Sequence, residues 1–428
     1  MSKRAKNSNK EHPSNRLNRK QGKKQEKKQK KNHFKHDNDK RSKKLSYSSN
    51  KRKNKNIKKE YHPSFFPLIN NSLSQNPQKI PSWLPPSTLT IKNPYDKLHQ
   101  EIIDYAKHIE PKDSQLDKRL TTYSLFTEII NSKWPKWTIK CFGSYSQGTQ
   151  TIFSDLDFVI FKNESDPISD IDMLKEISRW LKRKQFGYNI QIIRARVPII
   201  KVVCKTGINV DISVNRHNGW EAAQIIKKKM DDIPVLKPII MFLKMLLRNE
   251  HLNEAHLGGM SSFLLFSIVF FYYQRILKNQ KCLIDIEPST SGSDQAETDD
   301  DDDIQIANVK TKQKEKKIDQ ETLDRINKDI NYGRFLLGFL KFFGSVFNYI
   351  QMGITLRNGG DFYYKVERDD MDCSSMLSVE NFQDRTSDIG RSCFCFDKIR
   401  SLFHHTYNLI KQEKDNHTIS FLAALNLP

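Results

Sequence analysis

The segment that decides the fold is FGSYSQGTQTIFSDLDFVIF, Phe142 to Phe161. A Gly-Ser turn, Gly143 and Ser144, lies eleven residues ahead of Asp155 and Asp157, which open the apolar run FVIF. Because side chains alternate along a strand, both aspartates project to one face, while their apolar neighbours project to the other. Two carboxylates on one face of an otherwise buried strand indicate a functional site.

A third carboxylate lies on a second predicted strand. ARVPIIKVVCKTGINVDISVN, residues 195–215, consists of two apolar runs joined by CKTG, which predicts a β-hairpin. Apolar and polar residues alternate strictly in its second run, so Asp211 faces away from the core. Three carboxylates on neighbouring strands repel one another unless cations lie between them.

This combination of residues predicts a site for phosphoryl transfer. Oxygen-only ligands suit a hard ion such as Mg²⁺. Gly143 lets backbone N–H groups approach a phosphate, and the Ser144 hydroxyl can donate to one. Lys244 and Arg248 are four residues apart on a predicted helix and can neutralise the rest of a triphosphate, although alone they are more typical of a solvated helix face. We therefore predict a two-metal site.

Composition separates a basic N-terminal tail from the rest of the chain. The protein has 428 residues and a net charge of +22, and residues 1–60 hold 24 Lys and Arg against 5 Asp and Glu, a net +19. This Lys-, Asn- and Ser-rich segment has almost no aliphatic residues, so we expect it to be disordered. Such a polycation can bind RNA phosphates or act as a nuclear localisation signal; a merely solubilising tail is the alternative.

We expect neither a secretory signal nor a membrane span. No hydrophobic segment follows the start methionine. The longest uncharged run, Leu257–Gln274, reaches the lower limit for a span but contains three serines, so we expect a buried core helix. Six cysteines without a CxxC pair indicate reduced thiols rather than a zinc site.

Periodic patterns along the chain predict an α+β protein. Apolar residues recur at helical spacing in 98–109, 120–130 and 170–185, and most of the chain after Glu221 also has helical character. An acidic, then basic, low-complexity stretch interrupts this pattern. The predicted parts are a disordered tail at 1–85, a mixed sheet with helices at 113–225, a helical domain at 86–112 and 226–428, and a disordered insertion at 286–320.

Several stretches carry a family resemblance. FGS with SDLDFVIF and INVDIS resembles the signature of the DNA polymerase β-like nucleotidyltransferases. VDISVNRHNGWEAAQII, LNEAHLGGMSSFLLF, FGSVFNYIQMGITLRNGGDFYYK and SDIGRS are similar to the nuclear non-canonical poly(A) polymerases, the catalytic subunit type of the TRAMP complex. The resemblance spans about Leu98 to Phe396. It implies a polymerase β-like palm and a mostly helical central domain, with the nucleotide between them.

The resemblance also implies roles for single residues. Asp155, Asp157 and Asp211 match the catalytic, metal-binding triad of the family, and Gly143 and Ser144 match its phosphate-contacting turn. The other matches are nucleotide contacts: Lys244 and Arg248 at the triphosphate, Ser262 at a phosphate, Phe263 under the base, Asn215 near the ribose and Asp388 in the base-recognition segment.

The base-recognition segment departs most from the family. Relatives show an acidic residue and Pro ahead of an Asn-Asp-Val-Gly-Arg run, whereas this chain reads VENFQDRTSDIGRS. Uridylyl-transferring relatives often carry a His at the position of Ser387, and its absence favours adenine. A changed polar contact shifts base choice by about 1–3 kcal/mol, which is enough to blur it.

We therefore expect a template-independent poly(A) polymerase that adds AMP from ATP to RNA 3′ ends with Mg²⁺ or Mn²⁺. The resemblance implies a role in nuclear RNA surveillance and exosome-linked decay. It also implies two partners, a zinc-knuckle RNA-binding protein and an exosome-associated RNA helicase, and a location in the nucleus or, more narrowly, the nucleolus. The basic tail can supply part of the RNA affinity.

Other functions share parts of this pattern. A terminal uridylyltransferase differs only in nucleotide preference. A non-catalytic RNA-binding scaffold has no need to keep three mutually repelling carboxylates, and a small-molecule nucleotidyltransferase has no need of a polybasic tail. For the acidic insertion we expect a disordered loop, with an autoinhibitory phosphate mimic as the alternative.

Overall fold

The computed structural model describes residues 80–163, 166–194, 197–284, 320–368, 375–415, 420–425 and 427. The expected disordered tail lies outside the described residues as far as residue 79, and the expected insertion lies outside them as far as residue 319.

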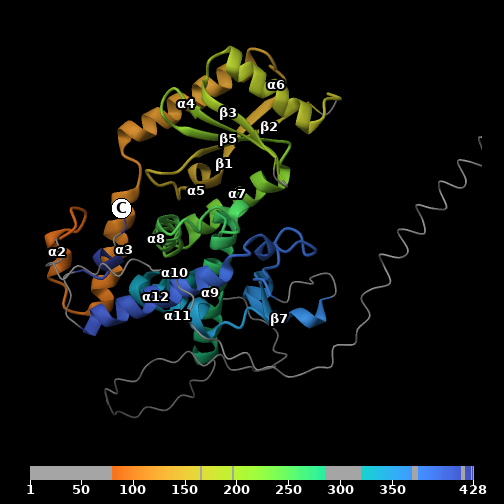
Figure 1. Ribbon diagram of the computed structural model, residues 1–428. Coiled ribbons are helices and arrows are strands. Elements are labelled where there is room, and N and C mark those ends of the chain that lie inside the picture. The colour runs from red at the N-terminus through yellow and green to blue at the C-terminus, as the bar shows by residue number, and fades with distance from the viewer. Residues whose placement is uncertain are drawn as a thin grey trace, which may run out of the picture. The chain divides into compact units, whose positions relative to one another are not determined.

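A five-stranded mixed sheet forms the centre of the sheet lobe, Asp113–Val214 (Figure 1). Its strand order is β1-β2-β5-β4-β3, with β2 and β5 parallel and the other neighbours antiparallel. The predicted hairpin is confirmed as β4 and β5, whereas β3 was not predicted. The strands are β1 (Thr138–Phe142), β2 (Leu156–Phe161), β3 (Gly187–Ile193), β4 (Ile199–Cys204) and β5 (Asn209–Val214).

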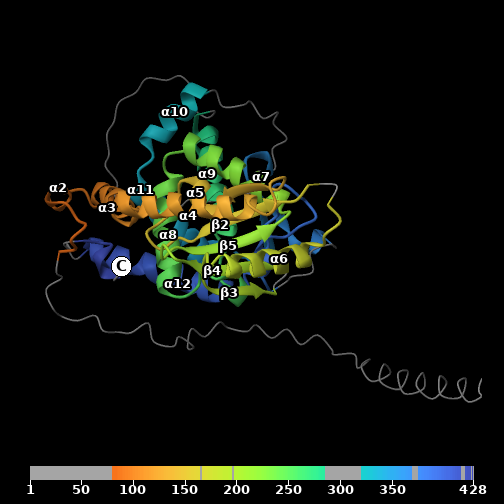
Figure 2. The ribbon, with the colours of Figure 1, turned by 90° about the horizontal axis from the view of Figure 1, so that it is seen from above.

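Two helices cover one face of this sheet, α4 (Asp113–Asn131) and α6 (Asp170–Arg183) (Figures 1 and 2). Their apolar faces pack on the inward residues of the strands; for example, the rings of Phe126 and Phe158 stack with centroids 4.4 Å apart. The short helix α5 (Gly143–Gln147) and helix α7 (His217–Asp232) contact each other and β1 on the side away from α4 and α6.

The helical lobe comprises the described residues before Asp113 and after Val214. Its other helices are α2 (Pro86–Leu89), α3 (Pro94–Ile109), α8 (Leu236–Asn249), α9 (Ser262–Ile284), α10 (Gln320–Asp329), α11 (Tyr332–Lys341) and α12 (Phe396–Asp415). It also contains the hairpin β6 (Met352–Thr355) and β7 (Asp361–Tyr364), the π-helix η3 (Phe342–Val346), and the 3-10 turns η2 (Ala255–Leu257), η4 (Arg357–Gly359), η5 (Lys365–Glu367), η6 (Gly390–Ser392) and η7 (Ala423–Leu425).

The helices of this lobe enclose a second hydrophobic core. The predicted apolar face of α3 is buried in it, and α3 packs against α8 and α11. The apolar run that begins at Leu257 enters α9, whose residues Leu264–Val269 are fully buried or nearly so. None of the described helices is long and apolar enough to cross a membrane. The expected α+β class, with a mixed sheet and a mostly helical second part, is confirmed.

The C-terminal residues are anchored to α3 by one buried carboxylate. Glu101 is fully buried and accepts hydrogen bonds from the Ser420 hydroxyl at 3.0 Å, from Phe421 N at 3.3 Å and from Leu422 N at 3.0 Å. Figure 1 shows the C-terminus beside α3. Residues 420–422 are thereby fixed to the first long helix.

Candidate active site

The two aspartates of the opening segment lie at the start of β2. Asp155 immediately precedes the strand, and Asp157 is its second residue. Leu156 and Phe158 are completely buried on the face that α4 and α6 cover, whereas both aspartates are partly exposed. The alternation inferred from the sequence therefore holds, and the carboxylates occupy the opposite face.

Asp211 lies beside Asp157 because β2 and β5 are parallel neighbours. The two residues are direct register partners, and the Asp211 side chain is 21% exposed. Burial of the carboxyl group in the surrounding protein raises the pKa of Asp157 to about 7, and the charges of Asp211 and Asp155 raise it further. Burial raises the pKa of Asp211 as well, although Lys201 opposes the shift. The structure thus brings the three predicted carboxylates together.

Lys201 is a part of the site that sequence reasoning missed. It lies opposite Asp211 on β4, and its Nζ is 2.9 Å from Asp211 Oδ2. The turn closes through Cys204 N and the carbonyl of Ile208 at 2.8 Å, and counting outward from that pair places Lys201 opposite Asp211. Counting from the ends of CKTG would place Lys201 opposite Val210, so this contact was not evident from the sequence. Lys201 balances part of the negative charge, while its side chain remains 42% exposed.

The carboxylates have the donor chemistry of a site for divalent ions. Carboxylate oxygens are the ligands that Mg²⁺ and Mn²⁺ prefer, and a cation would relieve the repulsion that raises these pKa values. As the side chains lie, no three His, Cys, Asp or Glu residues in the described part of the chain are arranged to hold a metal ion. The donor types fit the ion, and metal binding by the triad stays a prediction.

The Gly-Ser turn packs directly on the second aspartate. Phe142, at the end of β1, pairs with Asp157, and Gly143 follows with φ +65°. A Cβ at position 143 would lie 2.1 Å from Asp157 Oδ2, so only glycine fits this position. Ser144 follows as the second residue of α5 and is 9% exposed. Phosphate binding by this turn stays a prediction.

Lys244 belongs to the helical lobe and places its ammonium group near the carboxylates. It lies on α8, and its Nζ donates to the carbonyl of Thr149 at 3.2 Å. Burial lowers the pKa of Lys244 to about 8, and the charge of Asp157 opposes the shift. Arg248, one helical turn later, is exposed, and its guanidinium lies 4.9 Å from the centroid of the Phe153 ring. Both cations therefore face the segment that leads to Asp155.

Ser262 and Phe263 begin helix α9. Ser262 is exposed, whereas Phe263 is partly buried. The Phe263 ring lies 5.4 Å from the ring of Phe382, with an angle of 58° between the planes. An aromatic pair is present where a single stacking residue was expected.

Asn215 makes contacts within the protein at the end of β5. Its Oδ1 accepts from the backbone N of Lys162 at 3.2 Å, and its Nδ2 donates to Asp170 Oδ1 at 2.6 Å. Its φ of +52° is one that asparagine tolerates better than most residues. These bonds join the end of the strand to the start of α6, and a ribose contact stays a prediction.

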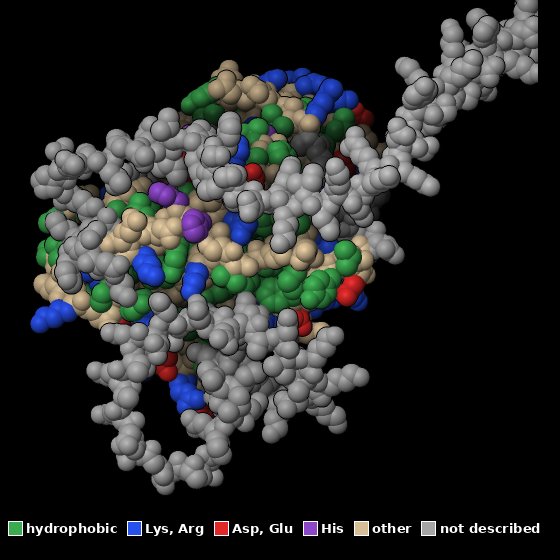
Figure 3. All heavy atoms as spheres, turned by 60° about the horizontal axis from the view of Figure 1, so that its bottom comes forward, with side chains coloured by type: hydrophobic (Ala, Val, Ile, Leu, Met, Phe, Trp, Pro, Cys, Tyr) green, Lys and Arg blue, Asp and Glu red, His purple; other side chains and the backbone are tan. Residues whose placement is uncertain are grey.

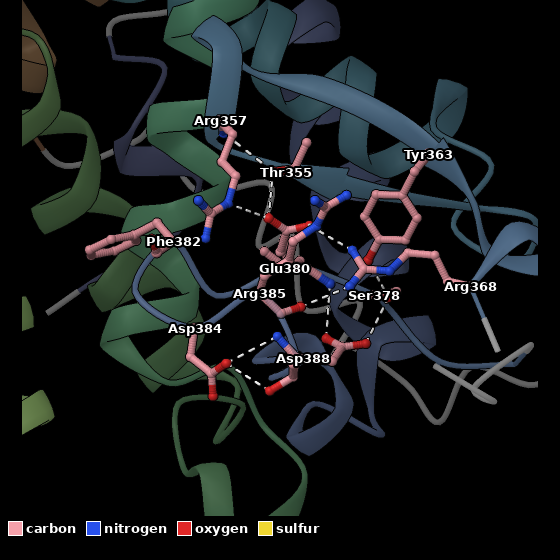
Figure 4. Close-up of polar contacts among 12 residues, drawn as sticks. Thr355, Arg357, Tyr363, Arg368, Ser378, Glu380, Phe382, Asp384, Arg385 and Asp388 are labelled. Atoms are coloured by element: carbon pink, nitrogen blue, oxygen red, sulfur yellow. Dashed lines mark hydrogen bonds and ion pairs between the residues drawn. The ribbon is translucent and has the colours of Figure 1, made fainter. Parts of the chain in front are cut away.

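Asp388 has both carboxylate oxygens occupied (Figure 4). Oδ1 accepts from Val379 N at 2.9 Å and Gly390 N at 2.7 Å, and Oδ2 accepts from the Ser378 hydroxyl at 2.7 Å. The side chain therefore fixes the shape of the base-recognition segment. A nucleotide contact by Asp388 is not tested by these bonds and stays a prediction.

Glu380 organises the same segment and was not singled out from the sequence. Its side chain is 4% exposed and lies between Arg357 Nε, at 2.6 Å, and Arg368 Nη1, also at 2.6 Å (Figure 4). Arg385 Nε lies 4.0 Å away. Because Arg357 lies in the turn between β6 and β7 and Arg368 follows β7, this carboxylate ties the segment to that hairpin. A buried acid needs such partners, and sequence spacing does not reveal them.

The arrangement as a whole suits transfer of a phosphoryl group. Three carboxylates lie close together with oxygen donors of the kind that divalent cations prefer, a lysine approaches them from the other lobe, and the glycine at position 143 makes room for one carboxylate.

Comparison with known families gives two matches, one that spans the sheet lobe with its flanking helices and one within the helical lobe. Residues 98–228 match the model described as poly(A) RNA polymerase, mitochondrial-like, central palm domain. Residues 331–386 match the model described as Cid1 family poly A polymerase.

Individual relatives agree with these matches. The chain is 29% identical over 322 residues to the poly(A) RNA polymerase CID14 of Cryptococcus neoformans, which covers 74% of this chain and 37% of the relative. The chain spans 37%, 32% and 40% of the length of three of its curated relatives.

Solved structures share the fold. The polymerase core of TRAMP, described as an RNA surveillance complex, has a TM-score of 0.61 at 24% identity and covers 79% of this chain and 94% of that one. The Cid1 poly(U) polymerase has a TM-score of 0.56 at 17% identity, covering 75% and 98%. These likenesses confirm the expected palm and helical central domain.

Proposed function

Because both lobes match families of the non-canonical poly(A) RNA polymerases, we propose that this protein is a template-independent poly(A) polymerase that transfers AMP from ATP to an RNA 3′ hydroxyl. The observation that carries the proposal is the register of Asp157 with Asp211, with Asp155 two residues earlier, directly before the same strand. That register gathers three carboxylates on one sheet face, next to a lysine from the other lobe.

Each residue of the site has its own role in the proposed reaction. Asp155, Asp157 and Asp211 would hold Mg²⁺ or Mn²⁺, which supplies activation of the attacking hydroxyl and neutralisation of the leaving pyrophosphate. Lys244 binds and orients the triphosphate, because its ammonium already lies near Asp157. Gly143 leaves room for the Asp157 carboxylate beside the turn. The new bond joins the RNA 3′ oxygen to the α-phosphorus, and the bond to pyrophosphate breaks.

We propose the partners and setting that the family resemblance implies. One similar structure is named as part of an RNA surveillance complex, which supports a role in RNA surveillance, and we propose that this role is linked to decay by the exosome. We infer RNA 3′ ends as the substrate, and a zinc-knuckle RNA-binding protein and an RNA helicase as partners. We also propose a nuclear, including nucleolar, location. In Figure 3, Lys and Arg side chains lie scattered among hydrophobic ones on the described part of one face. Because contacts to RNA phosphates come from Lys and Arg side chains, a partner that binds RNA would add affinity to this face.

A uridylyltransferase is the second candidate, because the fold is also that of the Cid1 poly(U) polymerase. The serine at position 387 favours adenine only modestly. Measured nucleotide preference decides between the two.

The test is primer extension with purified full-length protein. A labelled RNA with a free 3′ hydroxyl is incubated with Mg²⁺ or Mn²⁺ and each nucleoside triphosphate separately, beside the same RNA ending in a 3′-deoxynucleotide. We expect extension with ATP, none on the 3′-deoxy RNA and none with Asp211→Asn. Extension mainly with UTP would establish the second candidate. No extension by the wild type, alone or with a zinc-knuckle partner, would identify a scaffold.

A further inference from the structure

Arg119 is a fully buried arginine beside the candidate active site. It lies on α4, its residue is 1% exposed, and it is among the largest side chains buried to this degree in the described part of the chain. Burying a cation is costly unless hydrogen bonds and nearby charges compensate it. The hydrogen bonds of this guanidinium therefore indicate which segment of the chain it stabilises.

Both bonds go to the segment that carries the first aspartate, the Asp155 loop, Gly148–Asp155. Arg119 Nη1 donates to the carbonyl of Ser154 at 2.7 Å, and Nη2 donates to the carbonyl of Thr151 at 3.2 Å. Burial lowers the pKa of Arg119, and the nearby Asp155 carboxylate opposes that shift. The guanidinium is thus hydrogen-bonded to the backbone directly before Asp155 and interacts electrostatically with the Asp155 carboxylate.

Other elements also hold the loop, among them α3, whose last residue, Ile109, accepts a hydrogen bond from Ile152 N at 2.9 Å, and α8. Lys244, from the helical lobe, donates to Thr149 at the start of the loop, and this same ammonium is the one proposed to bind the triphosphate. Arg119 is buried, and we do not propose that it binds nucleotide. When a nucleotide binds Lys244, the hydrogen bonds from Arg119 to the loop are therefore kept.

We propose that Arg119 is a positioning residue, which fixes the Asp155 loop and thereby the Asp155 carboxylate. Removing the guanidinium leaves the buried carbonyl of Thr151 and the partly buried carbonyl of Ser154 without these donors, and it removes the positive charge near Asp155. The loop must then shift or admit water. A displacement of about 1 Å at a catalytic group costs on the order of 10²-fold in rate. The activity readout rests on the proposed function, whereas the position of the loop does not.

The experiment compares Arg119→Met, Arg119→Lys and the control Thr122→Val in the full-length protein. Thr122 is a buried residue one turn along α4, whose hydroxyl lies 2.6 Å from the Thr206 hydroxyl in the β4–β5 turn and makes no bond to the Asp155 loop. Amide hydrogen exchange of residues 149–156 is measured without RNA or ATP. The kcat, the KM for ATP and the Tm are measured in parallel.

For Arg119→Met we expect exchange in residues 149–156 to accelerate by about tenfold or more, and kcat to fall by about 100-fold with little change in the KM for ATP. Lysine can satisfy one of the two carbonyls, so Arg119→Lys should recover part of both losses. Thr122→Val should lower the Tm and keep kcat within about threefold of the wild type.

The proposal is overturned if Arg119→Met lowers the Tm while loop exchange and kcat stay at wild-type values. It is also overturned if Arg119→Lys recovers nothing. Should Arg119→Met fail to fold, Arg119→Lys decides, since its loop must exchange faster than that of Thr122→Val. If the wild type shows no polymerase activity, loop exchange alone decides for or against the positioning role, so failure of the proposed function remains distinguishable.

Discussion

Asp157 and Asp211 are direct register partners on two parallel strands, and their side chains share one face of the sheet. This pairing places two negative charges side by side in a site where the surrounding protein raises the pKa of Asp157 to about 7. A cation of the right size would relieve the repulsion. The pairing therefore makes the proposed function testable without RNA.

We expect divalent ions to stabilise the wild type more than Asp157→Asn. Asparagine keeps the size of the side chain but removes one charge that attracts the ion. Adding millimolar Mn²⁺ should raise the Tm of the wild type, with a much smaller rise in the variant. Differential scanning fluorimetry with and without chelator measures this difference. An equal Tm rise in both proteins would show that the ion binds elsewhere.

Gly143→Ala should abolish activity, whereas Gly148→Ala should not. Both glycines have positive φ, so alanine costs about 1–2 kcal/mol of backbone strain at either position. Only at position 143 does the new Cβ meet Asp157 Oδ2, at 2.1 Å, while nothing lies within 4 Å at position 148. We expect activity to fall by about 100-fold or more for Gly143→Ala alone.

Urea denaturation of both glycine variants supplies the control, because the strain at the two positions is similar. Equal losses of activity at equal losses of stability would contradict a specific role for the contact between Gly143 and Asp157.

Lys201→Met should tighten metal binding. The ammonium of Lys201 lies 2.9 Å from Asp211 Oδ2 and competes there with any cation. Because the lysine is 42% exposed, solvent weakens its effect, and we expect a gain in Mn²⁺ affinity of only a few-fold. Isothermal titration with Mn²⁺ gives the affinity directly. Weaker binding in the variant would mean that Lys201 orients Asp211 for the ion.

Glu101→Gln should change how stability depends on pH. Burial raises the pKa of Glu101 above the value of 4.5 that it has in the unfolded chain, although its three hydrogen bonds oppose the shift. Between the two pKa values the folded state holds more protons, so wild-type stability falls as pH rises through that window. Glutamine does not titrate and loses this dependence.

The measurement is urea denaturation of the wild type and Glu101→Gln from pH 4 to pH 8. The free energy of unfolding of the variant, relative to the wild type, should rise across the window and level off above it. Glu128→Gln, an exposed position on α4, controls for a change of charge alone. A difference that stays constant with pH would contradict the account.

Short-range patterns predicted the parts of the structure that depend on neighbouring residues. The alternation around Asp211 predicted its strand and the face of its side chain, and the spacing in Leu98–Ile109 predicted the buried face of α3. The position of Asp155 and Asp157 on the exposed face of β2 followed from the same period of two.

Contacts between distant segments could not be read in this way. Arg119 and the Asp155 loop are separated by 35 residues in the bond to Ser154, and Glu380 meets Arg357 across 23 residues. No periodicity links such pairs, because the fold rather than the spacing brings them together. Strand β3 was also missed, since polar residues interrupt its apolar pattern. Lys201 is intermediate, because its hairpin was predicted, but the register that pairs it with Asp211 depends on how the turn after Cys204 closes.

The most direct test of the central claim is incorporation of labelled AMP into a short RNA by the wild type and by Asp155→Ala/Asp157→Ala at equal concentrations of folded protein. The account predicts ladders of added nucleotides with ATP for the wild type, and a loss on the order of 10³-fold or more in the double variant. Equal incorporation by both proteins would contradict it, because the carboxylates on β2 would then have no part in the reaction.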